Sequence, residues 1–245
     1  MDKLEFMQAC DKVINIEKVR SGIGTLSEKT LHAVLKLYFE PDEGKHEIKV
    51  GSLVADIVND TGIIEIQTRS FDKLRKKLEA FLLVSSVTVV YPIANAKWLL
   101  WIDKNTGEIT KKRKSPKKGT PYEALYELYK IKALLPKDNL KLCIVMLDIE
   151  EYRYLNGWSE DGKKGSSRCD RIPIDIAAEI HIESIADYMK FIPEELPMQF
   201  TTKDYKKATG LSLSNAQTAL NVLNYVSAVN RVGKKGNMYL YEKKL

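Results

Sequence analysis

The stretch GSLVADIVNDTGIIEIQ, residues 51–67, decides the fold of this chain. Two apolar runs rich in β-branched residues flank an Asp-Thr-Gly turn sequence, which predicts two neighbouring strands joined by a hairpin. Asp56 lies on the first strand, and Glu65 and Gln67 share one face of the second. Carboxylates on apolar strands cost free energy unless a partner neutralises them, and Mg²⁺ prefers carboxylate oxygens. The stretch therefore predicts a site for a divalent cation.

The residues on either side of this stretch predict an α/β fold. Helical periodicity covers residues 3–20, 26–39, 71–83 and 122–135. Extended apolar runs predict strands at 46–50, 53–59, 62–68, 87–93, 98–103, 108–112 and 140–147. In the first helix, the apolar residues at helical spacing are Leu4, Met7, Cys10 and Ile14. The strand–strand–strand–helix–strand order that begins at residue 46 indicates an α/β sandwich with a mixed sheet.

The character of the sequence changes at IPEELP, residues 192–197, where two prolines mark a junction. A threonine at 201 or 202 can cap a short helix, Gly210 makes a turn, and a second helix follows. The apolar face of that second helix is formed by Leu213, Ala216, Leu220 and Leu223. A hairpin with GKKG at its tip completes the pattern of a winged helix. We therefore expect two domains, residues 1–185 and 186–245.

Composition restricts the class of protein. No apolar run approaches the roughly 18 residues that span a bilayer, and the charged start MDKLEFMQACDK lacks a signal-peptide core, so we expect a cytoplasmic protein without membrane contact. The three scattered cysteines indicate neither a disulfide framework nor a zinc site. Residues 200–245 contain eight Lys/Arg and two acidic residues, Asp204 and Glu242. The net charge of this segment is therefore +6, which equals that of the whole chain. A basic end on a neutral body is typical of contact with a polyanion.

Four positions resemble a known family. Glu28 on the second predicted helix, Asp56, and Glu65 followed two residues later by Gln67 resemble the PD-(D/E)xK nuclease superfamily, which includes many restriction endonucleases and archaeal Holliday-junction resolvases. The resemblance covers about residues 25–95 and extends less clearly to 150. Asp56 follows Ala55 instead of proline, and Gln67 stands where the signature ends in lysine. Some restriction enzymes likewise carry glutamine there.

This resemblance implies a restriction-endonuclease-like core, a mixed sheet flanked by helices, and a role for each matching residue. Asp56 and Glu65 would bind Mg²⁺ or Mn²⁺, with the Ile66 carbonyl as a further ligand. Glu28 would hold the metal through water or orient the site. Gln67 would orient a water without supplying the positive charge of lysine, and a second metal or Lys73 could compensate. The implied activity is metal-dependent hydrolysis of DNA phosphodiester bonds, in restriction, repair or defence in a prokaryote.

The winged-helix pattern implies a second set of contacts with DNA. The second helix of such a motif usually enters the major groove, where asparagine and glutamine can pair with adenine. Its polar residues with this role would be Ser214, Asn215, Gln217, Thr218 and Asn221. Lys234 and Lys235 at the hairpin tip would contact phosphates.

The sequence leaves other interpretations open. Glu28 can be a helix cap only, and Asp56 and Glu65 can be solvated residues of an edge strand. The nuclease fold can also serve as a catalytically inactive DNA-binding scaffold, and the winged helix can dock a partner protein of a defence system. RNA stays open as a substrate. A homodimer is expected only from the resemblance, because nucleases of this superfamily often dimerise to cut both strands.

Overall fold

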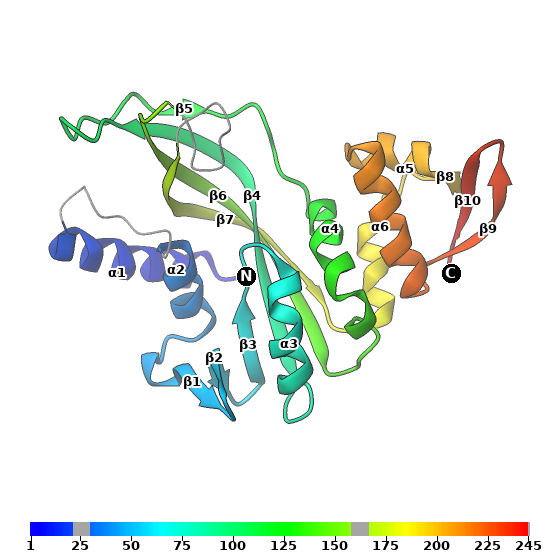
Figure 1. Cartoon of the computed structure of the whole chain (residues 1–245), viewed down its shortest axis with the longest axis horizontal. Helices are drawn as coiled ribbons and strands as arrows, with labels where there is room; N and C mark the ends of the chain where they lie inside the picture. The colour runs from blue at the N-terminus through cyan, green and yellow to red at the C-terminus, as the bar shows by residue number, and fades with distance from the viewer. Residues whose placement is uncertain (22–29, 158–166, 245) are drawn as a thin grey trace. The chain divides into compact units, whose positions relative to one another are not determined.

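The computed structural model describes residues 1–21, 30–157 and 167–244 of the chain (Figure 1). Its helices are α1 (Lys3–Ser21), α2 (Thr30–Phe39), α3 (Phe71–Phe81), α4 (Ala124–Leu128), α5 (Thr202–Thr209) and α6 (Leu213–Tyr225). Short 3-10 helices are η2 (Glu43–Lys45), η3 (Pro121–Glu123), η4 (Tyr129–Leu134) and η5 (Ile185–Phe191). The strands are β1 (His46–Val50), β2 (Leu53–Asn59), β3 (Gly62–Ile66), β4 (Val87–Ile102), β5 (Arg113–Lys114), β6 (Leu140–Tyr154), β7 (Arg168–Ile182), β8 (Gln199–Thr201), β9 (Val229–Lys235) and β10 (Met238–Lys243).

Within the described residues, seven strands form one mixed sheet in the order β1-β2-β3-β4-β6-β7, with β5 paired to β4. β2 and β3 are antiparallel, with Ile57 opposite Ile64, whereas β3 and β4 are parallel, with Glu65 opposite Val89. The expected order of three strands, a helix and a strand is observed in β1, β2, β3, α3 and β4. The predicted α/β class with a mixed sheet is therefore confirmed.

The chain groups into two compact units that share the long strands β4, β6 and β7. Unit 1 contains residues 1–48, 94–119 and 145–179, and unit 2 contains residues 49–93, 120–144 and 180–245. In the part of the chain that the structure describes, no helix is both long enough and apolar enough to cross a membrane.

In unit 1, α1 packs on α2 with a different face from the one expected. Phe6 is fully buried and meets the ring of Tyr38 edge-on, with 5.4 Å between centroids, whereas Leu4 and Met7 are exposed. The buried residues of α1 are Phe6, Ala9, Cys10 and Val13. The stripe of Leu4, Met7, Cys10 and Ile14 therefore does not coincide with the buried face, because both stripes have helical spacing and packing against the partner helix selects between them.

The long strands also differ from expectation. β4 runs without interruption through residues 98–102. The hairpin partner expected at 108–112 is present as a bridge between Ile102 and Ile109 and not as a regular strand, and the short β5 continues the pairing at Trp98 and Leu99. β7, which runs to Ile182, has no counterpart among the predicted strands. Pro173 makes β7 hard to predict from the sequence, because proline lacks the N–H that a strand donates to its neighbour. β7 is the last strand in the sheet order, and such an edge strand tolerates proline.

In unit 2, residues 199–243 form two helices and a small sheet in the order β8-β10-β9. Thr201 caps α5 through a capping box with Asp204, and Gly210 ends the helix in the left-handed region, at φ 71°. Tyr205 is fully buried, and its hydroxyl donates a 2.9 Å hydrogen bond to the Phe191 carbonyl. On α6, the expected apolar residues are buried except Leu213, which is 43% exposed.

Candidate functional site

Asp56 and Glu65 lie on neighbouring strands, and the side chain of each accepts a hydrogen bond from the backbone of the opposite strand. Because Ile57 pairs with Ile64, the register places Asp56 opposite Glu65. The Asp56 N–H donates to Glu65 Oε1 at 3.1 Å, and the Ile66 N–H donates to Asp56 Oδ2 at 2.8 Å. These side chains take the place of carbonyl acceptors at the end of the β2–β3 ladder. The two predicted carboxylates therefore meet at one point of the sheet.

Lys77 completes this carboxylate pair with a positive charge. α3 lies beside β3 (Figure 1), and the Lys77 ammonium is 2.6 Å from Glu65 Oε2. Only 3% of the Glu65 side chain is exposed, whereas a quarter of the Lys77 side chain is. Lys77 also lies 5.6 Å from the centre of the Phe81 ring. The sequence suggested Lys73 for this compensation; Lys77, one helical turn later, is the lysine that contacts Glu65.

The electrostatics of the pair favour an additional cation. Burial of Glu65, together with the charge of Asp56, raises the pKa of the Glu65 carboxyl to about 7, although Lys77 acts in the opposite direction. Burial makes the largest contribution to this shift, and the charge of Asp56 adds to it. A raised carboxyl pKa with a specific charged neighbour is common at functional sites.

Gln67 supports the turn between β3 and α3. Its backbone N–H donates to the Val90 carbonyl at 2.9 Å, and its side-chain amide donates to the carbonyls of Arg69 and Ser70. Ser70 has a left-handed backbone, at φ 60°, which the amide bonds help to hold. The Phe71 N–H that begins α3 donates to the Glu127 carboxylate at 2.8 Å. Gln67 thus positions the helix that carries Lys77. The remaining predicted site residue, Glu28, lies outside the described residues.

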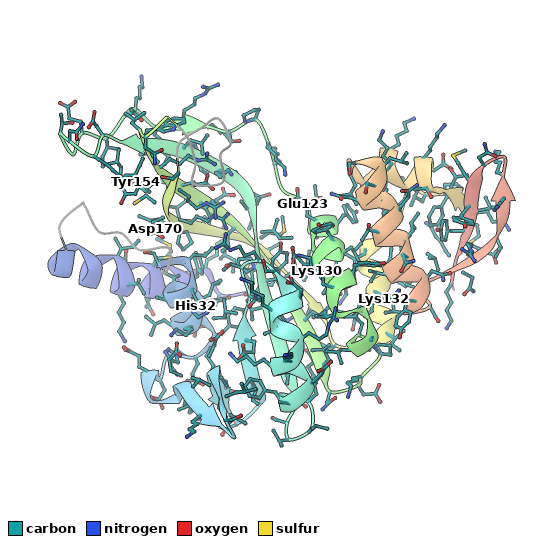
Figure 2. The ribbon with its side chains drawn as sticks, viewed as in Figure 1. His32, Glu123, Lys130, Lys132, Tyr154 and Asp170 are labelled. Carbon is teal, nitrogen blue, oxygen red and sulfur yellow. The ribbon has the colours of Figure 1, made fainter. Side chains whose placement is uncertain are left out.

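The residues predicted to contact DNA from α6 and the hairpin are mostly at the surface. Ser214, Gln217 and Asn221 are exposed along α6, and Asn215 and Thr218 are half-buried. Asn221 Oδ1 accepts a 2.9 Å hydrogen bond from the ammonium of Lys132 on η4 (Figure 2). Lys132 also covers the rings of Tyr129 and Tyr225, at 5.2 and 4.8 Å from their centres. This face of α6 therefore carries a positive charge that α6 itself lacks.

Two further groups of basic residues lie on the same segment of unit 2. Lys234 and Lys235 are the last residues of β9 and are exposed, and the turn to β10 follows at Gly236, where φ is 62°. A hollow of about 350 Å³ next to α5 is lined by Lys203, Lys206, Lys207 and Leu213. Sequence analysis missed the α5 lysines, although their spacing of three and four residues predicts a common helix face.

Comparisons with known proteins identify a family without a known activity. Residues 29–183, more than half of the chain, match the family described as a domain of unknown function (DUF8091). A protein of Treponema pallidum (strain Nichols), described as uncharacterized, is 28% identical over 228 residues, which cover 90% of this chain and 87% of that protein. No solved structure matches the chain.

Proposed function

The chain belongs to the DUF8091 family, and we propose that it is a metal-dependent nuclease that hydrolyses phosphodiester bonds in DNA. The observation that carries the proposal is the meeting of Asp56 and Glu65 on β2 and β3, with Lys77 of α3 at the edge of the pair. The resemblance to PD-(D/E)xK nucleases supports the proposal, because it assigns the metal ligands to these two carboxylates.

The donor set fits Mg²⁺ or Mn²⁺. Two carboxylates supply the oxygen ligands that these hard cations prefer, and the Ile66 carbonyl is the further ligand that the resemblance implies. Burial of Glu65 and the nearby charge of Asp56 raise the pKa of the Glu65 carboxyl, and a divalent cation would stabilise its ionised form. A bound divalent cation would polarise the scissile phosphate and lower the pKa of a bound water.

In this proposal the residues of the chain have separate tasks. Asp56 and Glu65 would hold the cation, and their bonds to the backbone of the opposite strand fix the orientation of both carboxylates. Lys77 is available to bind a phosphate oxygen once a cation has taken over the charge of Glu65. It would supply the positive charge that Gln67 does not, and it would stabilise the negatively charged transition state. Gln67 keeps α3 in position through its bonds to the turn.

We propose that residues 199–243 act as a winged helix that brings DNA to unit 2. The polar face of α6 offers Ser214, Gln217 and Asn221 to base edges, with Asn215 and Thr218 beside them. The lysines of α5 and the pair Lys234 and Lys235 suit phosphates on either side of a groove. Excess positive charge in this segment supports the proposal.

A cleavage assay tests the activity. Purified protein would be incubated at pH 8 with supercoiled, linear, single-stranded and branched DNA, with Mg²⁺, with Mn²⁺ or with EDTA. We expect metal-dependent cleavage of at least one substrate, lost in Glu65→Gln and kept in Glu79→Gln, which changes an exposed glutamate of α3. Absence of cleavage across all of these substrates, or cleavage by Glu65→Gln at the wild-type rate, would contradict the proposal.

One observation favours a second candidate function, a DNA-binding protein without catalysis. Lys77 already pairs directly with Glu65, so the carboxylate pair has a cationic partner without a metal. In that case the wild-type protein would bind DNA in a salt-sensitive way, would bind no Mn²⁺, and would leave every DNA substrate intact. Salt-insensitive association would instead favour the protein-docking role of the winged helix. The homodimer stays a prediction, which sedimentation with and without DNA would test.

A further inference from the structure

Two exposed tyrosines and one lysine form a small surface patch where η4 meets α6 in unit 2. Tyr129 begins η4, Lys132 follows on the same element, and Tyr225 ends α6. Tyr129 is 47% exposed and Tyr225 is 45% exposed. The Lys132 ammonium lies 5.2 Å from the centre of the Tyr129 ring and 4.8 Å from the centre of the Tyr225 ring. We call these three residues the Lys132 patch.

Helix packing and one hydrogen bond hold the patch together. α6 packs against α4 and η4, which brings Tyr225 to the lysine. The Lys132 ammonium donates a 2.9 Å hydrogen bond to Asn221 Oδ1, one helical turn before Tyr225. Gln217 is exposed a further turn earlier, on the same side of α6. The patch therefore continues the polar face of α6 that is proposed to contact DNA.

Lys132 carries a positive charge that is available to a ligand. Among the residues that the structure describes, no carboxylate lies within 4 Å of its ammonium. Lys130, on the same element, differs, because it pairs with Glu127 at 2.9 Å and with Asp72 at 3.6 Å (Figure 2). The tyrosine rings attract the Lys132 ammonium only weakly, as cation–π contacts at exposed sites do. An anion can therefore compete for Lys132.

We propose that the Lys132 patch binds single-stranded DNA, with bases stacked on the two tyrosine rings and a phosphate on the Lys132 ammonium. A single strand repeats base and phosphate along its length, and aromatic rings beside a cation match that repeat. Stacking of a base on a ring is stronger than the cation–π contact of an exposed lysine, so a base can displace the ammonium from the ring. In a duplex the base faces are covered by neighbouring bases, and the rings have nothing to stack on.

The choice of DNA as the ligand rests on the proposed function, whereas stacking at the patch requires neither a metal nor cleavage. The inference adds a substrate class to that function: a single strand, or the unpaired strand at an end or a branch. Tyr126 is 49% exposed and precedes Tyr129 by three residues in the same helical stretch, so it would extend the path to a further base.

Fluorescence anisotropy of a labelled oligothymidine with the full chain, in EDTA and at pH 8, tests the proposal. We expect wild type to bind, and the variant Tyr129→Ala/Tyr225→Ala to bind at least tenfold more weakly, since each alanine removes one stacking surface. The matched control, Tyr129→Phe/Tyr225→Phe, keeps both rings and should retain the wild-type affinity within about twofold. Absence of binding by wild type, or equal affinity in the alanine variant, overturns the proposal.

A strand without bases separates stacking from charge and needs no variant to fold. The probe is an abasic deoxyribose phosphate strand with the same number of phosphates as the oligothymidine. We expect wild type to bind it at least tenfold more weakly than the oligothymidine. Equal affinities for the two strands would show that charge alone drives binding and would overturn the proposal.

The phosphate contact is tested by Lys132→Gln. We expect the slope of log affinity for oligothymidine against log salt to fall by about 0.7, the value for one phosphate of a single strand. Lys137→Gln, at an exposed lysine outside the patch, is the control and should keep the wild-type slope. The same slope in Lys132→Gln and wild type would overturn the assignment of a phosphate to Lys132.

Two further probes show which proposal fails. Binding of a duplex without binding of oligothymidine would overturn this inference and leave DNA binding by the winged helix standing, whereas binding of neither would count against both. We expect oligothymidine to bind at least as tightly as oligouridine, because the thymine methyl adds area to the stacked contact. Tighter binding of oligouridine would overturn the assignment to DNA.

Discussion

Glu65 and Glu151 are both almost fully buried, yet their surroundings have opposite charge. Glu65 faces a second carboxylate, Asp56, and one lysine, and its burial together with Asp56 raises its pKa to about 7. Burial also acts to raise the pKa of Glu151, but Lys97, Arg153 and Arg168 outweigh it and hold that pKa below its usual value. Burial alone therefore does not decide how a glutamate behaves.

The difference indicates which ligand each site can take. At Glu65 a second carboxylate acts with burial against ionisation, so a bound cation would stabilise the ionised carboxylate. At Glu151 cations from three strands already stabilise the ionised form, so that glutamate needs no further cation.

The largest expected effect is on catalysis at the negative site. Lys77→Met removes the ammonium beside Glu65, and we expect the cleavage rate to fall about 10²–10³-fold, the cost of losing one electrostatic stabiliser of a transition state. Single-turnover kinetics at saturating Mg²⁺ would measure the change. Lys76→Met, on the exposed side of the same helix, is the control and should keep the wild-type rate. Equal rates for the two variants would show that Lys77 has no catalytic part.

The same substitution at the two glutamates should affect folding very differently. Glu151→Gln leaves four cations around a neutral amide, and we expect it to lower the free energy of unfolding by about 3 kcal/mol, the lower end for breaking a buried ion pair because these cations are partly exposed. Glu65→Gln, measured at pH 8 without metal, removes a carboxylate whose ionisation destabilises the folded state, so it should not lower the free energy of unfolding. Urea unfolding measures both. A larger decrease in the free energy of unfolding for Glu65→Gln than for Glu151→Gln would contradict this prediction.

The raised pKa of Glu65 predicts a pH-dependent stability. The folded protein keeps the Glu65 proton up to about pH 7, whereas the unfolded chain releases it near 4.5, so this group's contribution to stability is lost as the pH rises between these values. The total is on the order of 3 kcal/mol. Urea unfolding of metal-free wild type and Glu65→Gln from pH 4 to 8 isolates this term as the difference between the two curves. A difference that stays constant with pH would show that the Glu65 pKa is not raised.

The smallest expected effect is at the hairpin of β9 and β10. Lys234→Gln/Lys235→Gln should weaken DNA binding several-fold and lower the slope of log affinity against log salt by about 1.8, or about 0.9 for each phosphate that a lysine no longer neutralises. Fluorescence anisotropy between 50 and 200 mM salt measures the slope. Lys141→Gln, a substitution on β6 away from the hairpin, serves as the control. An unchanged slope of log affinity against log salt in the double variant would show that the hairpin does not contact DNA phosphates.

Sequence alone predicted the carboxylate pair because it depends on local rules. Strand alternation and the Asp-Thr-Gly turn fix the register of β2 and β3, and the register places Asp56 opposite Glu65. The role of Lys77 was not predictable, because it depends on where α3 packs against the sheet. The amide of Gln67 likewise serves the β3–α3 turn, and side-chain bonds to a turn leave no periodic trace in the sequence.

The cations around Glu151 escaped prediction for a different reason. They come from three strands far apart in the sequence, and one of these strands, β7, contains Pro173. Without β7, Arg168 and Arg171 have no place beside Glu151. Long-range pairing of strands is the information that composition and periodicity do not contain.

Calorimetric titration of Mn²⁺ into wild type and into Asp56→Asn/Glu65→Gln tests the central claim most directly. The titration is done at pH 8, where Glu65 is largely ionised, with and without a short DNA duplex whose phosphates can complete the site. The account predicts Mn²⁺ binding at one site in wild type and its loss in the double variant. Failure of wild type to bind Mn²⁺ under either condition, or undiminished binding by the double variant, would contradict it.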